Sequence, residues 1–374
     1  MKKRIVFLSG TRADFGKMKS LIQVIHNADD FDYHIFATGM HLLEKYGLTV
    51  IEIEKCGFKN IHRYSNYTSE TTMDLTLAKT IEGFSAFVKQ EKPDLIIVHG
   101  DRSEALAGAI VGSLNNILVG HIEGGEISGT VDELIRHAVS KLSHIHFVSN
   151  TVAANRLLQL GELEKSIFTI GSPDLDILFS KTLPKLSESK TYYEIPFEKY
   201  AVLLFHPVTT EIDQMAFYAE SLVQAVLDDE HNYIVVFPNN DLGSTSILKA
   251  YEKLKGNKRF RIFPSLRFEH FITFLGNAQF LLGNSSAGIH EAPYLGIPTI
   301  NIGRRQENRD IDNIEIINVE SDIKNILDGI AKVKKMNLVA KKPTISGNSA
   351  HQFLTTLRSK VLWDLDHQKQ FKDL

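Results

Sequence analysis

Residues 94–114 have the sequence DLIIVHGDRSEALAGAIVGSL. An apolar run at 95–98 ends in a polar turn, and a segment with helical periodicity follows at 103–114. A short apolar run without alternation suits a strand that is buried on both faces, as the strands of parallel sheets are. The stretch therefore predicts one strand–turn–helix unit of a parallel α/β sheet.

The same unit recurs along the chain in two series. Apolar runs predict strands at 5–8, 34–36, 95–98, 117–119, 145–148 and 167–170, and then at 202–205, 233–237, 261–263, 280–282 and 299–302. Helical periodicity lies between them at 75–88, 103–114, 132–142, 214–227, 244–254, 269–275, 288–295 and 322–333. Strands that alternate with helices, joined by right-handed crossovers, form doubly wound sheets. We therefore expect an α/β protein with two Rossmann-like doubly wound domains that face a cleft.

The length of 374 residues agrees with two or three domains at about 150 residues each. A stretch at 175–199 is rich in Lys, Ser, Glu and Pro and has little periodicity, so we place the interdomain linker there. The expected domains are 1–175 and 200–346, with a helical tail at 347–374. Ligands of doubly wound folds bind at the carboxyl ends of the strands, so we examine the residues that follow each strand.

Composition excludes several classes of protein. Hydrophobic residues make up 43% and the net charge is −3, so no overall basic field favours nucleic acid or an anionic membrane. Cys56 is the single cysteine, which excludes an internal disulfide framework and a multi-cysteine metal site. No apolar stretch approaches the ~20 residues of a membrane span. We expect a soluble cytoplasmic protein without a nucleic-acid or membrane partner.

Charged residues follow two of the predicted strands, those at 5–8 and 95–98. Arg12 lies in a Gly-containing turn, where backbone N–H groups and a guanidinium suit a diphosphate. The alternative is a solvated surface turn. Asp101 and Arg102 follow the strand at 95–98, and Asp101 is a candidate general acid or base. The alternative is a helix cap in which Glu104 completes a capping box.

The loop at 120–133 is the richest candidate segment. It holds one histidine, His121, and four carboxylates, Glu123, Glu126, Asp132 and Glu133. Crowded like charges separate pKa values, which lets one site hold both an acid and a base. His121 and Glu123 resemble metal ligands, but neither a zinc-protease spacing nor an EF-hand is present. Asp132 has an alternative role as a helix N-cap.

Polar turns also follow the strands of the second series. His206 is suited to pair with a phosphate or to protonate a leaving oxygen, and the alternative is a packed histidine. Small residues open a predicted helix after 280–282 and form a candidate anion site, with Glu291 one turn further on for a ribose. The candidate nucleotide contacts in these turns are Asn239, Ser285, Ser286, Glu291, Arg304, Arg305 and Arg309. Polar turns, capped helix starts and a solvated basic loop are the alternatives.

Together these segments resemble the UDP-N-acetylglucosamine 2-epimerases, specifically the hydrolysing branch of bacterial sialic acid synthesis. The matching stretches are 10–16, 38–41, 99–102, 121–132, 171–174, 205–211, 238–241 and 283–288. The resemblance covers about residues 1 to 310 in order. It implies the glycosyltransferase-B fold, a UDP-sugar substrate and a homodimer, and no metal or redox cofactor.

The resemblance also implies a reaction. UDP leaves C1 as the C2 proton is removed, which gives a 2-acetamidoglucal, and water then adds to yield N-acetylmannosamine, the first step of sialic acid synthesis. Asp101, Glu123 and Asp132 would transfer protons, and His206 would stabilise departing UDP. The nucleotide-sugar would be held by Arg12, Arg102, Asn239, Arg267, Phe268, Ser285, Ser286, Glu291 and Arg305. Arg267 and Phe268 resemble the uracil-side loop.

Other functions remain open, among them a non-hydrolysing epimerase and a glycosyltransferase of the same fold, which would need an acceptor but not the carboxylate-rich loop. Relatives in legionaminic acid synthesis perform the same chemistry on UDP- or GDP-N,N'-diacetylbacillosamine, and the loop at 263–268 fits that branch equally well. The segment at 287–309 fits the UDP-N-acetylglucosamine branch better. A non-catalytic nucleotide-sugar-binding protein is a more distant alternative, against which the intact carboxylates Asp101, Glu123 and Asp132 argue.

Overall fold

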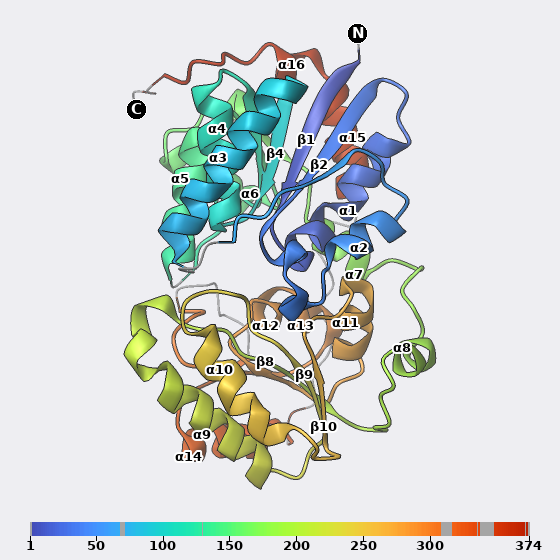
Figure 1. Ribbon diagram of the computed structural model, residues 1–374, viewed down its shortest axis with the longest axis vertical. Coiled ribbons are helices and arrows are strands. Elements are labelled where there is room, and N and C mark those ends of the chain that lie inside the picture. Colours follow the sequence, from blue (N-terminus) through green and yellow to red (C-terminus); the bar gives the residue numbers. More distant parts are fainter. Residues whose placement is uncertain are drawn as a thin grey trace. The chain divides into compact units, whose positions relative to one another are not determined.

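The computed structural model describes residues 2–67, 72–128, 130–307, 316–334, 336, 348–370 and 372. Two compact units make up the chain (Figure 1). Unit 1 comprises Met1–Glu126, Asp132–Asp176 and Ile345–Leu374, and unit 2 comprises Ile127–Val131 and Ile177–Thr344. Arg309, named above, and residue 129 of the loop at 120–133 lie outside the described residues.

Unit 1 is built on a parallel sheet, in which seven described strands have the order β3-β2-β1-β4-β5-β6-β7. The strands are β1 (Lys3–Ser9), β2 (Phe31–Ala37), β3 (Ile61–Arg63), β4 (Leu95–His99), β5 (Leu118–Ile122), β6 (Ile145–Val148) and β7 (Ile167–Thr169). Its helices are α1 (Arg12–His26), α2 (Val50–Lys55), α3 (Met73–Glu91), α4 (Ser103–Leu114), α5 (Val131–Leu142), α6 (Thr151–Gln159), α7 (Pro173–Leu178), α15 (Ser349–Arg358) and α16 (Lys360–Trp363). Short 3₁₀ turns are η1 (Gly39–Leu42), η2 (Glu44–Tyr46) and η3 (Glu164–Ser166).

Both faces of the central strands are covered, as their unbroken apolar runs predict. Ile5 and Phe7 of β1 belong to the core that α1 and α15 complete. Leu8 points to the opposite face, where it lies against Gly108 of α4. In Figure 1, α3 and α4 lie on one side of this sheet and α1 and α15 on the other. Phe353 of α15 lies between Phe7 and Phe147, with ring centroids 6.3 and 4.9 Å away, so the C-terminal tail is part of the unit 1 core.

Unit 2 repeats this plan with six described parallel strands in the order β10-β9-β8-β11-β12-β13. They are β8 (Ala201–Leu204), β9 (Tyr233–Val236), β10 (Phe260–Phe263), β11 (Leu281–Gly283), β12 (Thr299–Ile302) and β13 (Ile316–Val319). The helices are α8 (Leu186–Tyr192), α9 (Met215–Asp228), α10 (Ser244–Tyr251), α11 (Phe268–Leu275), α12 (Ala287–His290), α13 (Ala292–Leu295) and α14 (Ile323–Val333), and the 3₁₀ turns are η4 (Thr209–Gln214) and η5 (Glu252–Leu254).

The strand order places a topological switch point in each sheet. The first strand of each unit lies inside its sheet, and the order reverses between β1 and β4 in unit 1 and between β8 and β11 in unit 2. Open α/β sheets bind ligands beyond the carboxyl ends of the strands at such points. The predicted fold class, α/β with two Rossmann-like domains, is confirmed.

The structure differs from the sequence predictions at a few elements. The strands β3 and β13 were not predicted, because both are short edge strands with partly exposed residues. The helix predicted at 288–295 is divided into α12 and α13 at Glu291. Pro293 has no N–H to continue the hydrogen-bond ladder of α12, which explains the break. The helix α8 lies within the aperiodic stretch at 175–199.

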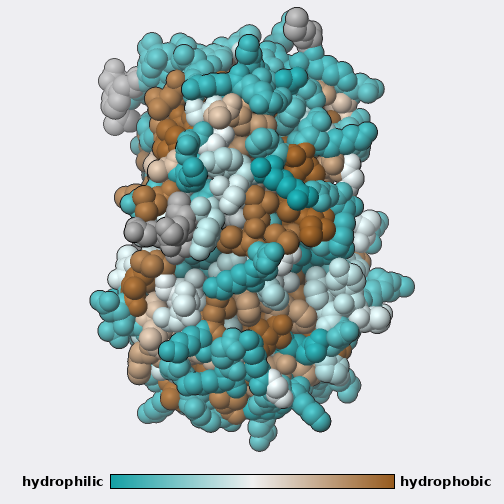
Figure 2. Space-filling model, viewed as in Figure 1, coloured by the Kyte–Doolittle hydropathy of each residue, from teal (hydrophilic) through white to brown (hydrophobic). Residues whose placement is uncertain are grey.

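Surface polarity agrees with the composition. On the face shown in Figure 2, hydrophilic side chains predominate and apolar side chains form separate smaller groups. None of the helices in the described ranges is long and apolar enough to cross a membrane.

Gly283 makes the close approach of β11 and β8 possible at the switch point of unit 2. Its φ is +138°, and an added Cβ would lie 2.0 Å from the carbonyl oxygen of Leu204. We expect Gly283→Ala to lower the free energy of unfolding by about 2 kcal/mol more than Gly256→Ala does. Gly256 is the matched control, because its φ is +77° but nothing lies within 4 Å of its added Cβ. Urea unfolding measures both variants, and equal losses would contradict the steric argument.

Candidate active site

The turns at the switch point of unit 1 place three predicted residues. Thr11 caps α1, because its Oγ1 accepts a hydrogen bond from Asp14 N at 3.1 Å, and Arg12 is the first residue of that helix. Gly100, with a φ of +71°, turns the chain after β4 so that Asp101 and Arg102 precede α4. The sequence also allowed Asp101 and Asp132 to be helix N-caps, but the structure places neither residue at that position. The N-cap of α4 is Arg102 rather than Asp101, and Asp132 lies inside α5.

Glu123 follows β5 in a strained backbone conformation. Its φ is +67°, in the left-handed region, which costs a residue other than glycine roughly 1–2 kcal/mol. Two basic side chains hold its carboxylate. Lys17 Nζ lies 3.0 Å from one oxygen, and His99 Nε2 lies 3.3 Å from the other. Strain of this kind persists where the surroundings fix the conformation, which is common at functional sites.

The buried His99 and Lys17 extend this contact into a row of alternating charges. His99 Nδ1 lies 3.8 Å from Asp14, and Lys17 Nζ lies 2.9 Å from Asp174. Burial alone would lower the pKa of His99, but the carboxylates of Glu123 and Asp14 raise that pKa above its ordinary value. Burial would likewise raise the pKa of Asp14, but the bond and charge of His99 lower it. His99 and Asp14 therefore stabilise each other's charged forms, whereas burial raises the pKa of Asp174.

Arg136 is a buried guanidinium at the centre of the carboxylates. It forms an ion pair with Asp101, and its side chain is only 4% exposed. Burial opposes its charge, but the charges of Asp101, Glu123, Glu126 and Asp132 together raise the pKa of Arg136. Arg136 lies four residues after Asp132 on α5, so both side chains lie on one side of the helix. A single buried cation thus interacts with a group of acidic side chains that includes all three candidate proton-transfer residues.

His121 supports the site as a neutral group. Burial lowers its pKa to about 3. Its Nε2 donates to the carbonyl oxygen of Gly100 at 2.8 Å, so Nδ1 is left to accept from Ser140 Oγ at 3.0 Å. The ring therefore links α5 to the turn that holds Asp101. Among the described residues, no group of three or more His, Cys, Asp or Glu is arranged to hold a metal ion.

In unit 2, hydrogen bonds fix the orientation and tautomer of His206. Asn284 bonds both sides of its backbone, accepting from His206 N at 2.7 Å and donating to His206 O at 2.9 Å. Asn239 N donates to His206 Nδ1 at 3.0 Å. Because a backbone N–H can only donate, the neutral ring carries its proton on Nε2. His206 therefore presents an N–H donor at the switch point.

The remaining predicted residues lie on neighbouring turns of unit 2. Arg305 Nη1 donates to the carbonyl oxygen of Asn284 at 3.3 Å, and Ser285 Oγ accepts from Ala287 N at 3.2 Å. Ser286 precedes α12, and the buried Glu291 lies between α12 and α13.

The two residues of the predicted uracil-side loop, Arg267 and Phe268, lie at the start of α11. Arg267 N donates to the Tyr193 hydroxyl at 3.0 Å, and its guanidinium lies 5.5 Å from the centre of the Tyr192 ring. Phe268 is the first residue of α11. The helix α8 and the residue after it, Tyr193, thus support this loop.

Comparison with known proteins places the chain in a family. The family model described as UDP-N-acetylglucosamine 2-epimerase matches residues 23–358. A Neisseria meningitidis serogroup B protein named UDP-N-acetylglucosamine 2-epimerase is 45% identical over 376 residues, which cover 100% of this chain and 99% of that protein. The chain belongs to the UDP-N-acetylglucosamine 2-epimerase family.

Further relatives of this epimerase family member extend the comparison. A Legionella pneumophila protein named UDP-N,N'-diacetylbacillosamine 2-epimerase (hydrolyzing) is 36% identical, with 97% of this chain and 98% of that protein covered. The crystal structure of a Methanocaldococcus jannaschii UDP-GlcNAc 2-epimerase in complex with UDP-GlcNAc and UDP has a TM-score of 0.80 at 22% identity. The match covers 95% of this chain and 99% of the Methanocaldococcus jannaschii chain, and this similarity supports the glycosyltransferase-B fold.

Sequence reasoning did not assign four residues that the structure places around the candidates. Lys17 and Arg136 lie one turn or more inside helices, His99 ends a strand, and Asn284 lies between a strand and a serine pair. A signal for Arg136 was present in its spacing of four residues from Asp132. No comparable pattern in the sequence indicated that Lys17 contacts Glu123 or that the Asn284 side chain bonds to the backbone of His206.

Proposed function

We propose that the protein is a hydrolysing 2-epimerase that converts UDP-N-acetylglucosamine to N-acetylmannosamine and UDP. The observation that supports this most directly is the 45% identity to a UDP-N-acetylglucosamine 2-epimerase over nearly the whole of both chains. Unit 1 supports it independently, because three candidate proton-transfer carboxylates share the buried Arg136 at the carboxyl ends of parallel strands. The product is the one that the resemblance to the sialic acid branch implies.

In the proposed first step, an ionised carboxylate removes the proton from C2 of the sugar. The electron pair of that C–H bond forms the C1–C2 double bond, and the bond from C1 to the UDP oxygen breaks. The products of this step are a 2-acetamidoglucal and UDP. The Nε2–H of His206 is suited to donate to the departing diphosphate, because Asn239 and Asn284 fix the ring and its tautomer.

In the proposed second step, water adds across the same double bond. Its oxygen bonds to C1, and a proton is delivered to C2 on the face opposite to the one first deprotonated. Two faces of one carbon require more than one proton-transfer group, and Asp101, Glu123 and Asp132 supply them. Positive charge from Lys17, His99 and Arg136 favours the ionised form of neighbouring carboxylates.

Unit 2 supplies the proposed nucleotide contacts. Arg305 and the serine pair Ser285 and Ser286 suit the diphosphate, because they surround the Asn284 turn at the end of β11. The buried carboxylate of Glu291 suits the ribose hydroxyls. We propose that Arg267 and Phe268 contact the uracil ring. Arg102 and Asn239 would provide additional contacts to the diphosphate.

An NMR time course with UDP-N-acetylglucosamine in heavy water, without added metal, tests this function. We expect release of UDP and of N-acetylmannosamine that carries deuterium at C2. A UDP-N-acetylmannosamine product would instead indicate a non-hydrolysing epimerase. Binding of UDP without any turnover would contradict the proposed substrate.

A second substrate is supported by the 36% identity to the Legionella pneumophila diacetylbacillosamine epimerase. The elimination and rehydration would be the same, and the sugar would carry a second acetamido group. Parallel time courses with UDP- and GDP-N,N'-diacetylbacillosamine distinguish the two. A kcat/KM higher for either of these donors than for UDP-N-acetylglucosamine would replace the proposed substrate.

Arg12 provides a test of the nucleotide site in unit 1. We expect Arg12→Ala to weaken UDP binding about tenfold, because a guanidinium at a helix start is a strong partner for a diphosphate. Calorimetric titration with UDP measures the change. Arg63→Ala is the control, since Arg63 is exposed on β3 and pairs with Glu54. Unchanged affinity in Arg12→Ala would remove this residue from the site.

A further inference from the structure

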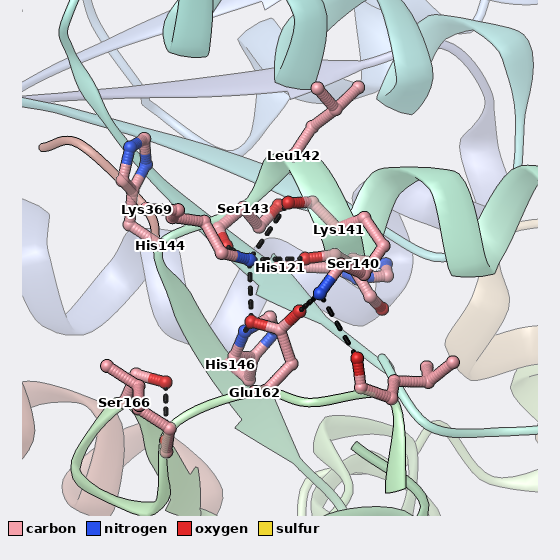
Figure 3. Close-up of polar contacts among 12 residues, drawn as sticks. His121, Ser140, Lys141, Leu142, Ser143, His144, His146, Glu162, Ser166 and Lys369 are labelled. Carbon is pink, nitrogen blue, oxygen red and sulfur yellow. Dashed lines mark hydrogen bonds and ion pairs between the residues drawn. The ribbon is translucent and has the colours of Figure 1, made fainter. Parts of the chain in front are cut away.

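A buried carboxylate outside the candidate active site holds a polar cluster in unit 1 (Figure 3). The Glu162 side chain is only 1% exposed. One oxygen accepts from Lys141 Nζ at 2.9 Å, and the other accepts from His146 Nε2 at 2.9 Å and from Lys369 Nζ at 2.6 Å. The cluster therefore joins α5, β6 and the C-terminal segment through one anion.

Lys369 also caps the C-terminal end of α5 with its side chain. Its Nζ lies 3.2 Å from the carbonyl oxygen of Ser140, 2.9 Å from that of Lys141 and 2.7 Å from that of Ser143, so its three N–H groups are shared among these oxygens and Glu162. The last carbonyls of a helix have no partner within the helix, and a cation there is favourable. One ammonium group thus satisfies carbonyl oxygens at the end of a helix while it pairs with Glu162.

His367 anchors the same segment a second time. Its carbonyl oxygen accepts from His144 Nε2 at 2.9 Å, and its ring Nδ1 lies 2.7 Å from the carbonyl oxygen of Asn116. His144 Nδ1 accepts from Val119 N at 3.1 Å, so the proton on Nε2 is fixed as the donor. Residues on either side of β5 therefore hold the segment that delivers Lys369.

The cluster contains one anion, Glu162, and two cations, Lys141 and Lys369. Burial would raise the pKa of Glu162, but the bond from His146 and the charge of Lys369 lower it to about 2. Burial lowers the pKa of Lys369, and the charge of Glu162 opposes that change. Burial also lowers the pKa of His146, so its neutral ring donates to Glu162. Both oxygens of the Glu162 carboxylate thus contact an ammonium group, and the neutral His146 ring adds a hydrogen bond.

The same helix carries candidate active-site residues at its other end. Asp132 lies in the first turn of α5 and Arg136 in the next, where Arg136 pairs with Asp101. Ser140, whose carbonyl binds Lys369, also bonds through Oγ to His121, and His121 bonds to the carbonyl of Gly100 beside Asp101. Contacts therefore run without a break from Lys369 to the turn of Asp101.

We propose that Lys369 is a positioning residue for the epimerase reaction. By fixing the C-terminal end of α5, its ammonium group orients Asp132 and Arg136 at the other end of the helix for proton transfer. The role in turnover rests on the proposed function, and the role in ordering α5 does not.

Lys369→Met tests this role, with Lys372→Met as the matched control, because Lys372 is an exposed lysine of the same C-terminal segment. We expect Lys369→Met to lower kcat for UDP release from UDP-N-acetylglucosamine about tenfold, with KM and UDP affinity within twofold of wild type. Hydrogen exchange of the α5 amides should become faster. Lys369→Arg, which keeps the charge, should restore at least half of the lost protection and part of kcat, and Lys372→Met should match wild type in both readouts.

Two outcomes would overturn the inference. One is a kcat in Lys369→Met equal to wild type at a temperature where the variant is folded, even if its Tm is lower, because that indicates a role in stability alone. The other is unchanged exchange of the α5 amides. A wild-type protein that does not turn over UDP-N-acetylglucosamine would overturn the proposed function instead, and the exchange measurement would still decide whether Lys369 orders α5.

Discussion

Replacing Glu123 by Gln is expected to lower kcat by a factor of about 10² or more, while UDP affinity stays within about twofold of wild type. The substitution keeps the size of the side chain but removes its charge and its ability to exchange a proton. Lys17 and His99 both contact this carboxylate, so the loss also disrupts the charge balance beside it. Steady-state kinetics of UDP release and calorimetric titration with UDP measure the two quantities.

The same variant has a spectroscopic readout that does not depend on substrate. The charge of Glu123 raises the pKa of the buried His99, whereas burial lowers it. Without that charge the effect of burial is opposed by fewer groups, so the pKa of His99 should fall and its proton should be lost at lower pH. An NMR titration of the imidazole signals measures this shift. An unchanged pKa would contradict the contact between the two side chains.

Asp132→Asn and Glu133→Gln complete the comparison. Asp132→Asn should lose turnover to the same degree as Glu123→Gln, whereas Glu133→Gln, at the neighbouring position, should keep turnover within about twofold. Glu133 lies near His137 rather than among the proposed proton-transfer groups. Near-wild-type turnover in both Glu123→Gln and Asp132→Asn would contradict the assignment of these carboxylates to proton transfer.

Much of the fold follows from local pattern, because strands buried on both faces leave unbroken apolar runs. The runs at 95–98 and 145–148 correspond to β4 and β6, and the periodic segment at 103–114 is α4. Edge strands lack this signal: β3 has two exposed residues among its three. A helix interrupted by Pro293 also keeps its apolar spacing, so periodicity alone could not divide α12 from α13.

The candidate site was predictable where chemistry lies in a turn directly after a strand. Asp101 and Glu123 are of this kind, because charged residues beside buried strands are costly unless they are used. Lys17 and Arg136 lie on helices, where a charged residue ordinarily faces solvent, and only the packing reveals that the side chains of both lie among carboxylates. The bond between Lys369 and Glu162 joins residues 207 positions apart, a separation that no local pattern encodes.

Arg136→Met is expected to reduce both stability and turnover more than any other single change to a basic residue of unit 1 considered above. The variant removes the guanidinium that pairs with Asp101 and whose charge interacts with Glu123, Glu126 and Asp132. Removing the buried partner of this ion pair should cost about 3 kcal/mol of unfolding free energy, because Asp101, which is only 22% exposed, and the neighbouring carboxylates lose their common cation. We expect kcat to fall about 10²-fold or more, since the same cation orders the proton-transfer groups. Urea unfolding and steady-state kinetics measure the two effects.

Two further variants separate the charge of Arg136 from its shape. Arg136→Lys should recover most of the stability but only part of kcat, because an ammonium group lacks the planar, two-pronged geometry of the guanidinium. The double variant Asp101→Asn with Arg136→Met should be more stable than Arg136→Met alone, since it also removes the carboxylate charge that lost its partner. Additive losses in the double variant would contradict the pairing of Arg136 with Asp101. Such a result would place the stabilising effect of Arg136 with Glu123, Glu126 and Asp132, whose charges also raise its pKa.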